Sequence, residues 1–124
     1  MSKSNFEYLE VYKLSEKLAD HLWMIVIQWN YFEKQTIGIQ MVEASDSIGA
    51  NIAEGSGRGT FKDNKRFVKI ARGSLYETKH WIKRAYKRNL IADHQIQILE
   101  PIVKELAPRL NAYLNSIGKK RSGN

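Results

Sequence analysis

The stretch from residue 96 to residue 117, IQILEPIVKELAPRLNAYLNSI, decides the fold class. Its apolar residues recur at alternating intervals of three and four, which predicts a helix with one continuous a/d seam. Pro101 and Pro108 lie seven residues apart on the side opposite the seam, so a bend there would curve the helix around its partners. The alternative is a helix that starts only after Pro101. The seam residues are Ile96, Leu99, Val103, Leu106, Leu110, Tyr113 and Ile117.

Two more helices are predicted in the first half of the chain. Residues 10–30 and residues 36–54 each carry one apolar stripe at helical spacing. Small residues along the second helix, among them Gly49, permit the close approach of a neighbouring helix. The expected inward-facing residues are Val11, Leu14, Leu18, Leu22, Ile25 and Trp29 in the first helix, and Ile37, Met41, Ala44, Ile48 and Ile52 in the second.

A glycine-rich turn over residues 55–59 separates the second helix from a third. Thr60 is the predicted N-cap of this third helix, with Asp63 as its capping-box partner, and Asp93 is the predicted cap of the last helix. The third helix should end near Asn89, and its expected inner face is Phe67, Ala71, Ser74, Thr78, Ile82 and Ala85. Four helices joined by short loops predict an all-α, antiparallel up-down four-helix bundle. We expect one domain over residues 1–118 and a basic, flexible tail over residues 119–124.

The composition excludes several classes of protein. With no cysteine among 124 residues, the chain has no disulfide scaffold, no Cys-ligated zinc site and no thiol nucleophile. The longest apolar stretch, residues 22–27, is too short to cross a bilayer, and the first residues lack the apolar core of a signal peptide. We therefore expect a cytoplasmic protein. No cofactor is expected, and the isolated His21, His80 and His94 do not have the spacing of metal ligands.

The net charge of +7 is concentrated in one segment. Residues 60–91 carry ten basic and two acidic side chains, and most of the basic ones fall on one line of the third helix, about 37 Å long, turned away from the predicted core. Such a line would neutralise phosphates in a salt-dependent manner, with a tyrosine available to stack on an exposed base. The alternative is a solvated outer face. This line, called the basic ridge below, consists of Lys62, Lys65, Lys69, Arg72, Tyr76, Lys79, Lys83 and Lys87.

The first helix carries apolar residues opposite its core stripe. A monomer does not normally expose such a patch, and Tyr and Trp are typical interface anchors. The patch predicts self-association, with a partner protein as the competing explanation. Its residues are Leu9, Tyr12, Trp23, Met24 and Ile27.

Three stretches of the sequence resemble a known family. Residues 51–58 read NIAEGSGR, Arg66-Phe67 is followed by IARGSLYE at residues 70–77, and the chain opens with FEYLEVY at residues 6–12; Gln40 with Ala44 fits as well. These stretches resemble the bacterial 23S rRNA intervening sequence proteins, over about residues 6–117. The resemblance implies a left-handed up-down four-helix bundle and a ring-like homo-oligomer of five subunits. A structurally similar group serves as accessory proteins to reverse transcriptases.

The chain departs from the family pattern at two places. Val42 and Glu43 stand where the family usually has arginine, and Gly49 stands where it usually has proline. The first change removes positive charge from the second helix, so any nucleic-acid role falls to the third.

The residues of the family motif favour a structural role. Glu54 as a general base would need a partner and a pocket, and neither is visible in the sequence. The glycine loop lacks the Gly-Lys-Ser/Thr ending of a phosphate loop, which leaves only an anion at the start of the third helix as an alternative. We expect Glu54 to pair with Arg58, Asn51 to satisfy backbone groups of the loop, and Gly73-Ser74 to allow close packing. The motif set is Asn51, Glu54, Gly55, Gly57, Arg58, Gly73 and Ser74.

These observations predict a non-enzymatic, basic homo-oligomer that binds nucleic acid, RNA in preference, through the basic ridge. The alternative is a protein-interaction scaffold or an accessory factor, for example of a polymerase or a reverse transcriptase, without a direct nucleic-acid role. No catalytic residue is assigned.

Overall fold

The computed structural model describes residues 2–119 and is helical throughout its regular elements. The long helices are α1 (Glu10–Val26), α3 (Ile39–Ser56), α4 (Phe61–Lys87) and α5 (Asp93–Ser116). A 3-10 turn, η1 (Asn5–Tyr8), precedes α1, and the short α2 (Tyr31–Glu33) and the π-helical η2 (Lys34–Gly38) lead into α3. The expected tail falls outside the described residues, except for Lys119.

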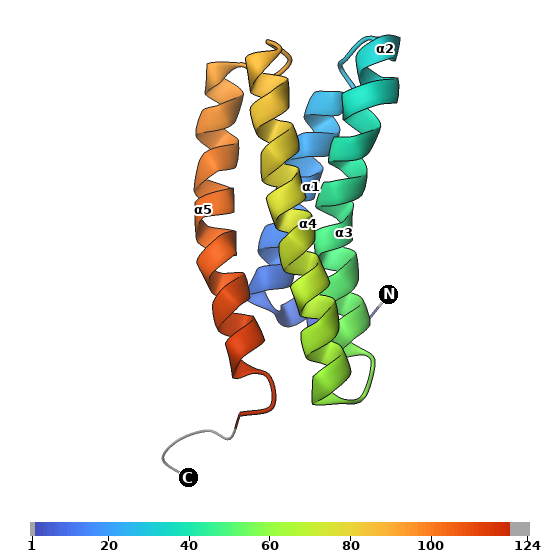
Figure 1. Cartoon of the computed structure of the whole chain (residues 1–124), viewed down its shortest axis with the longest axis vertical. Helices are drawn as coiled ribbons and strands as arrows, with labels where there is room; N and C mark the ends of the chain where they lie inside the picture. Colours follow the sequence, from blue (N-terminus) through green and yellow to red (C-terminus); the bar gives the residue numbers. More distant parts are fainter. Residues whose placement is uncertain (1, 120–124) are drawn as a thin grey trace.

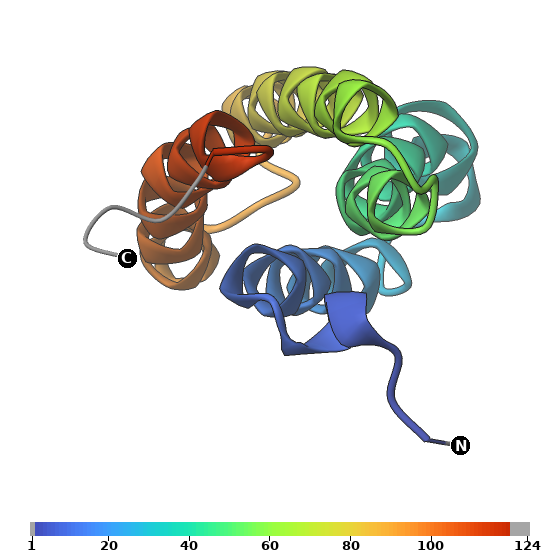
Figure 2. The ribbon, with the colours of Figure 1, turned by 90° about the horizontal axis from the view of Figure 1, so that it is seen from below.

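The four long helices run side by side and alternate in direction along the chain (Figure 1). Seen along the bundle axis they form a ring in which each helix lies next to its neighbours in sequence, with α5 returning to α1 (Figure 2). The predicted all-α four-helix bundle is therefore confirmed. Its left-handed sense stays a prediction. No helix within residues 2–119 is both long and apolar enough to span a membrane.

The core is built from the stripes of all four helices. All five inward-facing residues predicted for the second helix are buried, and so are Val11, Leu18 and Leu22 of α1. Leu14, Ile25 and Trp29 of the same predicted stripe are only half-buried, because Ser15, Ala19 and Val26 take the innermost positions. The apolar patterns thus predicted the core to within a small rotation of each helix.

The first helix is shorter than predicted, since α1 ends at Val26 and residues 27–30 form a turn. The backbone tightens there through hydrogen bonds from Gln28 to Ile25 and from Trp29 to Val26. The indole N–H of Trp29 donates to the carbonyl of Leu90, 3.0 Å away in the loop between α4 and α5. Trp29 therefore ends the helix by anchoring the turn to a distant loop.

The second helix begins earlier than predicted. It starts at Tyr31 and continues through α2 and η2 into α3 without an interruption. Thr36, where the prediction began, lies inside this rod and donates its hydroxyl hydrogen bond to the carbonyl of Phe32, 2.8 Å away. The π-helical segment ends at Gly38, whose Cα faces Val26 so closely that a Cβ would lie 2.9 Å from a Val26 methyl carbon.

The turn between α3 and α4 follows the prediction in outline. Gly59 has a positive φ of 87° and supplies the left-handed residue, whereas Gly57 is in the right-handed region. The hydroxyl of Thr60 accepts a hydrogen bond from the backbone N–H of Asp63 at 3.2 Å, which confirms Thr60 as the N-cap of α4.

The last helix runs through both prolines, so the alternative start after Pro101 is wrong. Pro101 and Pro108 are exposed, as expected for positions opposite the seam. The innermost residues of α5 include Ile102 and Leu114, which the seam had omitted, and Ile96, Val103 and Tyr113 are only half-buried. Asp93 is the first helical residue and not the cap, because Ala92 takes the cap position and the Asp93 carboxylate accepts a hydrogen bond from Tyr86.

Candidate nucleic-acid interface

The inner face of α4 is turned from the predicted direction. Val68 and Leu75 are buried at 0% and 2% exposure, whereas Phe67 and Ser74, which were expected inside, are half-buried. Ala71, Thr78, Ile82 and Ala85 are buried as predicted, and since each residue turns a helix by about 100°, the mean direction of the true inner face lies about 30° from the predicted one. The cause lies beside α3: the Phe67 ring packs under the guanidinium groups of Arg58 and Arg66, at 5.1 and 4.4 Å from its centroid.

Because the inner face of α4 is rotated from the predicted direction, the basic ridge lies on the side of α4 that faces α5, which is called the shoulder of α4 below. Lys62, Lys69, Tyr76, Lys83 and Lys87 are exposed, whereas Lys65, Arg72 and Lys79 are half-buried. The prediction that the ridge points directly away from the core is therefore wrong in angle. Its side chains still follow one line of the helix surface, because their spacing keeps them all on this shoulder.

Three ridge residues lie next to α5. The guanidinium of Arg72 donates a hydrogen bond to the side-chain oxygen of Asn111 at 3.1 Å. Lys79, together with Lys83, lines a groove between α4 and α5. The ammonium group of Lys79 also lies 5.4 Å from the ring centroid of Tyr76, which places a cation beside the exposed aromatic ring.

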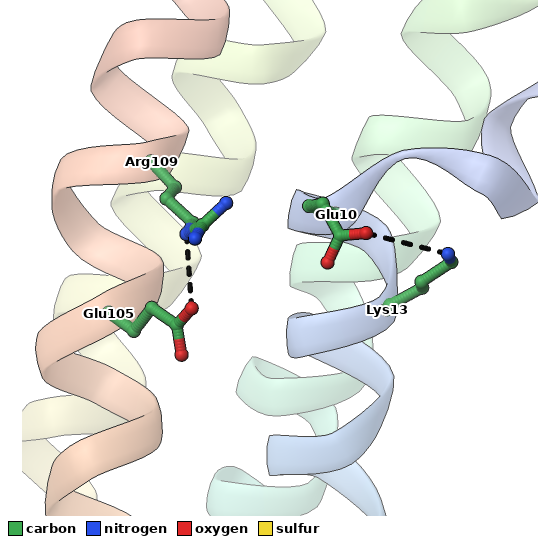
Figure 3. Close-up of polar contacts among 4 residues, drawn as sticks. All are labelled: Glu10, Lys13, Glu105 and Arg109. Carbon is green, nitrogen blue, oxygen red and sulfur yellow. Dashed lines mark hydrogen bonds and ion pairs between the residues drawn. The ribbon is translucent and has the colours of Figure 1, made fainter.

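The basic ridge is not neutralised by carboxylates in the described part of the chain. The ion pairs found in residues 2–119 involve other cations: Lys13, Arg58, Arg66, Lys104 and Arg109. Figure 3 shows two of these pairs, Glu10 with Lys13 on α1 and Glu105 with Arg109 on α5, each joining residues one turn apart.

The two acids of α4 are engaged away from the ridge. Asp63 lies 3.9 Å from Arg66, and Glu77 accepts a hydrogen bond from the indole of Trp81 at 3.1 Å. The shoulder therefore presents a row of uncompensated positive charges, which attracts an anionic chain.

The family motif forms a packed junction between α3 and α4. The hydroxyls of Ser47 and Ser74 lie 3.0 Å apart, and the amide of Asn51 donates to the carbonyl and the hydroxyl of Ser47 at 2.8 and 2.9 Å. The prediction that Asn51 bonds to backbone groups of the loop is therefore wrong, because its side chain bonds one turn back along its own helix. Glu54 and Arg58 pair across 3.7 Å, as expected.

Gly55, and not Gly73, is the glycine at which α3 and α4 approach closely. A Cβ on Gly55 would lie 2.7 Å from the side-chain oxygen of Asn64 and 3.0 Å from both the Asn64 carbonyl oxygen and the Phe67 Cβ. Gly73 faces outward, and a Cβ added to it would meet no atom of another residue within 4 Å. The predicted close-packing role of Gly73 is therefore wrong within this chain, because the inner face of α4 lies on its other side.

The apolar patch of α1 divides into two parts. Trp23, Met24 and Ile27 are 53%, 59% and 38% exposed. Leu9 and Tyr12 pack against the core instead, and the Tyr12 ring meets Phe6 edge-on at a centroid distance of 4.9 Å. The placement of these two residues opposite the core is wrong, because Tyr12 is covered by Phe6 of η1 and Leu9 lies on the side of α1 that faces Tyr113 of α5.

Burial and the neighbouring carboxylates, Glu16 foremost, raise the pKa of Tyr12, in keeping with its position under η1. At the other end of the patch, Trp23 and Ile27 meet Ile39 and Val42 of α3 around an open depression of about 360 Å³. Sequence reasoning missed Ile39, which is 39% exposed, because its helix was predicted to present apolar residues only to the core.

The histidines do not gather with other potential metal ligands. Within the described residues, no three side chains among His, Asp and Glu lie close enough to hold a metal ion. His80 packs edge-on against the neighbouring Trp81 at a centroid distance of 4.7 Å.

Comparison with known proteins places this bundle in a family. The family model described as 23S rRNA-intervening sequence protein matches residues 7–112. The chain belongs to this family. The match spans α1 and α3, the motif junction and most of α5, so the resemblance seen in the sequence extends over the whole bundle.

A solved structure has the same fold. It is a protein of unknown function from the S23 ribosomal protein family of Bacteroides thetaiotaomicron, which aligns with a TM-score of 0.75 and 20% sequence identity over 86% of this chain and 99% of that one. No curated protein matches the chain. Neither the family description nor that of the solved structure names an enzymatic activity.

Proposed function

We propose that this protein is a non-enzymatic nucleic-acid-binding protein that contacts phosphates through the basic ridge. The observation that carries the proposal is the row of cations along the shoulder of α4, none of which has a carboxylate partner within residues 2–119. A solvated face of a helix commonly contains acids one turn from its bases, as α5 does here. The family description mentions 23S rRNA, which makes RNA the first ligand to test.

The phosphate contacts are expected from Lys65, Lys69, Arg72, Lys83 and Lys87. The ridge extends from Lys62 to Lys87, about 37 Å, and its cations lie roughly one turn apart except where Tyr76 stands between Arg72 and Lys79. Contacts of this kind release counterions, so affinity should fall steeply with salt and depend little on sequence.

The test is a titration of a labelled structured RNA at several salt concentrations. The ridge variant carries Lys65→Glu, Lys69→Glu and Lys83→Glu; the matched control carries Lys3→Glu, Lys13→Glu and Lys17→Glu, which changes the net charge equally elsewhere. The ridge variant should bind at least tenfold more weakly, with a log–log salt slope shallower by about 2 to 3. No binding at low salt, or equal effects of the two variants, would show that the ridge is not the binding site.

We further propose that the protein forms a homo-oligomer through the exposed part of the α1 patch, Trp23, Met24 and Ile27, with Ile39. Support comes from the exposure of Trp23, Ile27 and Ile39 around one depression, with Met24 exposed next to Trp23 in α1, since a water-soluble monomer rarely leaves such apolar groups uncovered together. The ring of five subunits implied by the family resemblance stays a prediction.

Light scattering tests this interface. Trp23→Glu should lower the measured mass to that of a smaller species, whereas Ile70→Glu, a similar change at an exposed apolar residue of α4, should not. An unchanged mass of Trp23→Glu would refute the interface. A monomeric wild type would favour the competing function, in which the patch binds a partner protein and the chain serves as an adaptor.

A further inference from the structure

The helices α4 and α5 leave an open groove between them, of about 640 Å³. This volume lies within the range of about 300–1,000 Å³ that is typical of sites for small organic groups. The floor of the groove is apolar, and three of its residues are only half-buried, so they are accessible to a ligand. The floor consists of Ile82, Ile96, Leu99, Val103 and Ala107.

The rim of the groove is charged and belongs partly to the basic ridge. Lys79 and Lys83 form the α4 side. On the α5 side, Lys104 lies 2.9 Å from Glu100, so this pair contributes little net charge. Two uncompensated cations thus stand beside an apolar floor, and the hydrogen bond from Arg72 to Asn111 bridges the two helices further along the same side.

One end of the groove holds an aromatic ring in a fixed position. Tyr86 lines the groove and is 45% exposed. Its hydroxyl donates to the Asp93 carboxylate at 2.5 Å, which ties the ring to the first turn of α5. A flat ring held in this way offers a stacking surface at little entropic cost.

We propose that this groove takes unpaired bases of a single-stranded nucleic acid whose phosphates contact the basic ridge. The inference rests on the proposed function and specifies its ligand. A single strand presents apolar base faces on one side and phosphates on the other, which matches an apolar floor beside a row of cations. A duplex keeps its base faces stacked inside, so it can contact the ridge but gains nothing from the floor.

The length of the ridge favours a nucleic acid over a protein helix as the occupant. An acidic amphipathic helix would also fit an apolar groove with a basic rim. The row of cations, however, continues past the groove to Lys62, where the groove has no lining residues. Only a ligand that is charged along its whole length would contact both the cations at the groove and those that continue to Lys62.

The experiment compares two probes by fluorescence anisotropy at low salt. One is an oligouridine of about 12 nucleotides, within the site sizes of single-strand binders, and the other is a blunt RNA duplex of the same length. Tyr86→Ala should weaken oligouridine binding about 10-fold and leave duplex binding within about twofold, because stacking on one ring is lost. Tyr86→Phe, which keeps the ring but loses the hydrogen bond to Asp93, should bind oligouridine more tightly than Tyr86→Ala and more weakly than the wild type, and Tyr31→Ala, at an exposed tyrosine of α2, is the matched control.

The outcomes separate this inference from the proposed function. One outcome is that the duplex binds as tightly as oligouridine and that Tyr86→Ala changes the affinity for neither probe. If Lys65→Glu/Lys69→Glu/Lys83→Glu still weakens the binding of both probes, the groove assignment is then wrong and the basic ridge remains the binding site. If neither probe binds at low salt, both are wrong. If RNA does not bind, but an acidic amphipathic peptide binds to the wild type and not to Tyr86→Ala, the ligand of the groove and of the ridge is a protein and not a nucleic acid.

Discussion

Two glycines of the family motif provide a matched test of how α4 is oriented. Gly55 lies where α3 approaches α4, and Gly73 lies on the outer side of α4. The same substitution, glycine to alanine, should therefore have opposite effects at the two positions. Both residues lie in helices and have φ outside the left-handed region, so neither alanine is strained by its backbone.

The expected magnitudes follow from the space around each Cα. Gly73→Ala adds a methyl group to open solvent and gains the helix propensity of alanine, about 1 kcal/mol. Gly55→Ala places a Cβ 3.0 Å from the Asn64 carbonyl oxygen and the Phe67 Cβ, which are atoms of or next to the α4 backbone and cannot rotate away. Overpacking costs about 1–3 kcal/mol, and three contacts of 3.0 Å or less place Gly55 in the upper half of that range. After the gain of about 1 kcal/mol in helix propensity, the net change should be a loss of about 1–2 kcal/mol.

Thermal unfolding followed by circular dichroism measures the difference, at one protein concentration because self-association would shift Tm. For a chain of this size, 1 kcal/mol corresponds to about 4 °C. Gly73→Ala should raise Tm by about 4 °C and Gly55→Ala should lower it by about 4–8 °C. A lower Tm for Gly73→Ala would refute the outward orientation of Gly73 in the folded protein, and an unchanged or higher Tm for Gly55→Ala would refute the close approach of the two helices.

Three further substitutions test other parts of the bundle. Leu75→Ala should cost about 2–5 kcal/mol in chemical denaturation, because Leu75 is buried on the inner face of α4; a cost below about 1 kcal/mol would contradict that position. Pro108→Ala should raise the free energy of unfolding by about 1–3 kcal/mol, since it restores a helix hydrogen bond at an exposed site, and a decrease would show that the proline bend is needed for packing. Burial and the nearby Asp20 raise the pKa of Asp46 above its usual 3.8, so the ionisation of Asp46 disfavours folding. Asp46→Asn should therefore raise Tm slightly at pH 7, and this gain should disappear below pH 3.8, where Asp46 is protonated in the wild type. An equal gain in Tm at both pH values would exclude the titration of Asp46 as its cause.

The fold could be predicted because each apolar stripe repeats at helical spacing. In η2 and α3 the prediction was right at every inward position, since small residues on both sides leave Ile37, Met41, Ile48 and Ile52 as the large apolar groups of that face. In α4 the same reasoning chose Phe67 in place of Val68, because Phe67 is also apolar and lies at helical spacing from Ala71 and Thr78. Phe67 stays at the edge since two guanidinium groups cover its ring, one from the neighbouring Arg66 and one from Arg58 in the preceding turn, and the spacing of apolar residues does not reveal these contacts.

The residues of the candidate site could be predicted from the sequence, whereas the groove beside them could not. The ridge residues could be chosen from their spacing in α4 alone, and they do share one line of its surface. The groove beside them could not, because it depends on how far α5 stands from α4 and on the position of Tyr86 against Asp93. Leu9 and Tyr12 were misplaced for a related reason, since the pattern of α1 carries no information on the neighbouring segments, α5 beside Leu9 and η1 over Tyr12.

The hydrogen bond from Trp29 to the carbonyl of Leu90 has a consequence for the order in which the bundle comes apart. It joins two connections 61 residues apart, at the end of the bundle where α1 passes to α2 and α4 passes to α5. At that end α1 cannot separate from the α4–α5 pair until the indole leaves its partner, whereas the opposite end holds one short glycine turn, η1 and the last turn of α5. Opening should therefore start at the end with the glycine turn, and the backbone amides of residues 88–91 should exchange with solvent more slowly than those of residues 56–60.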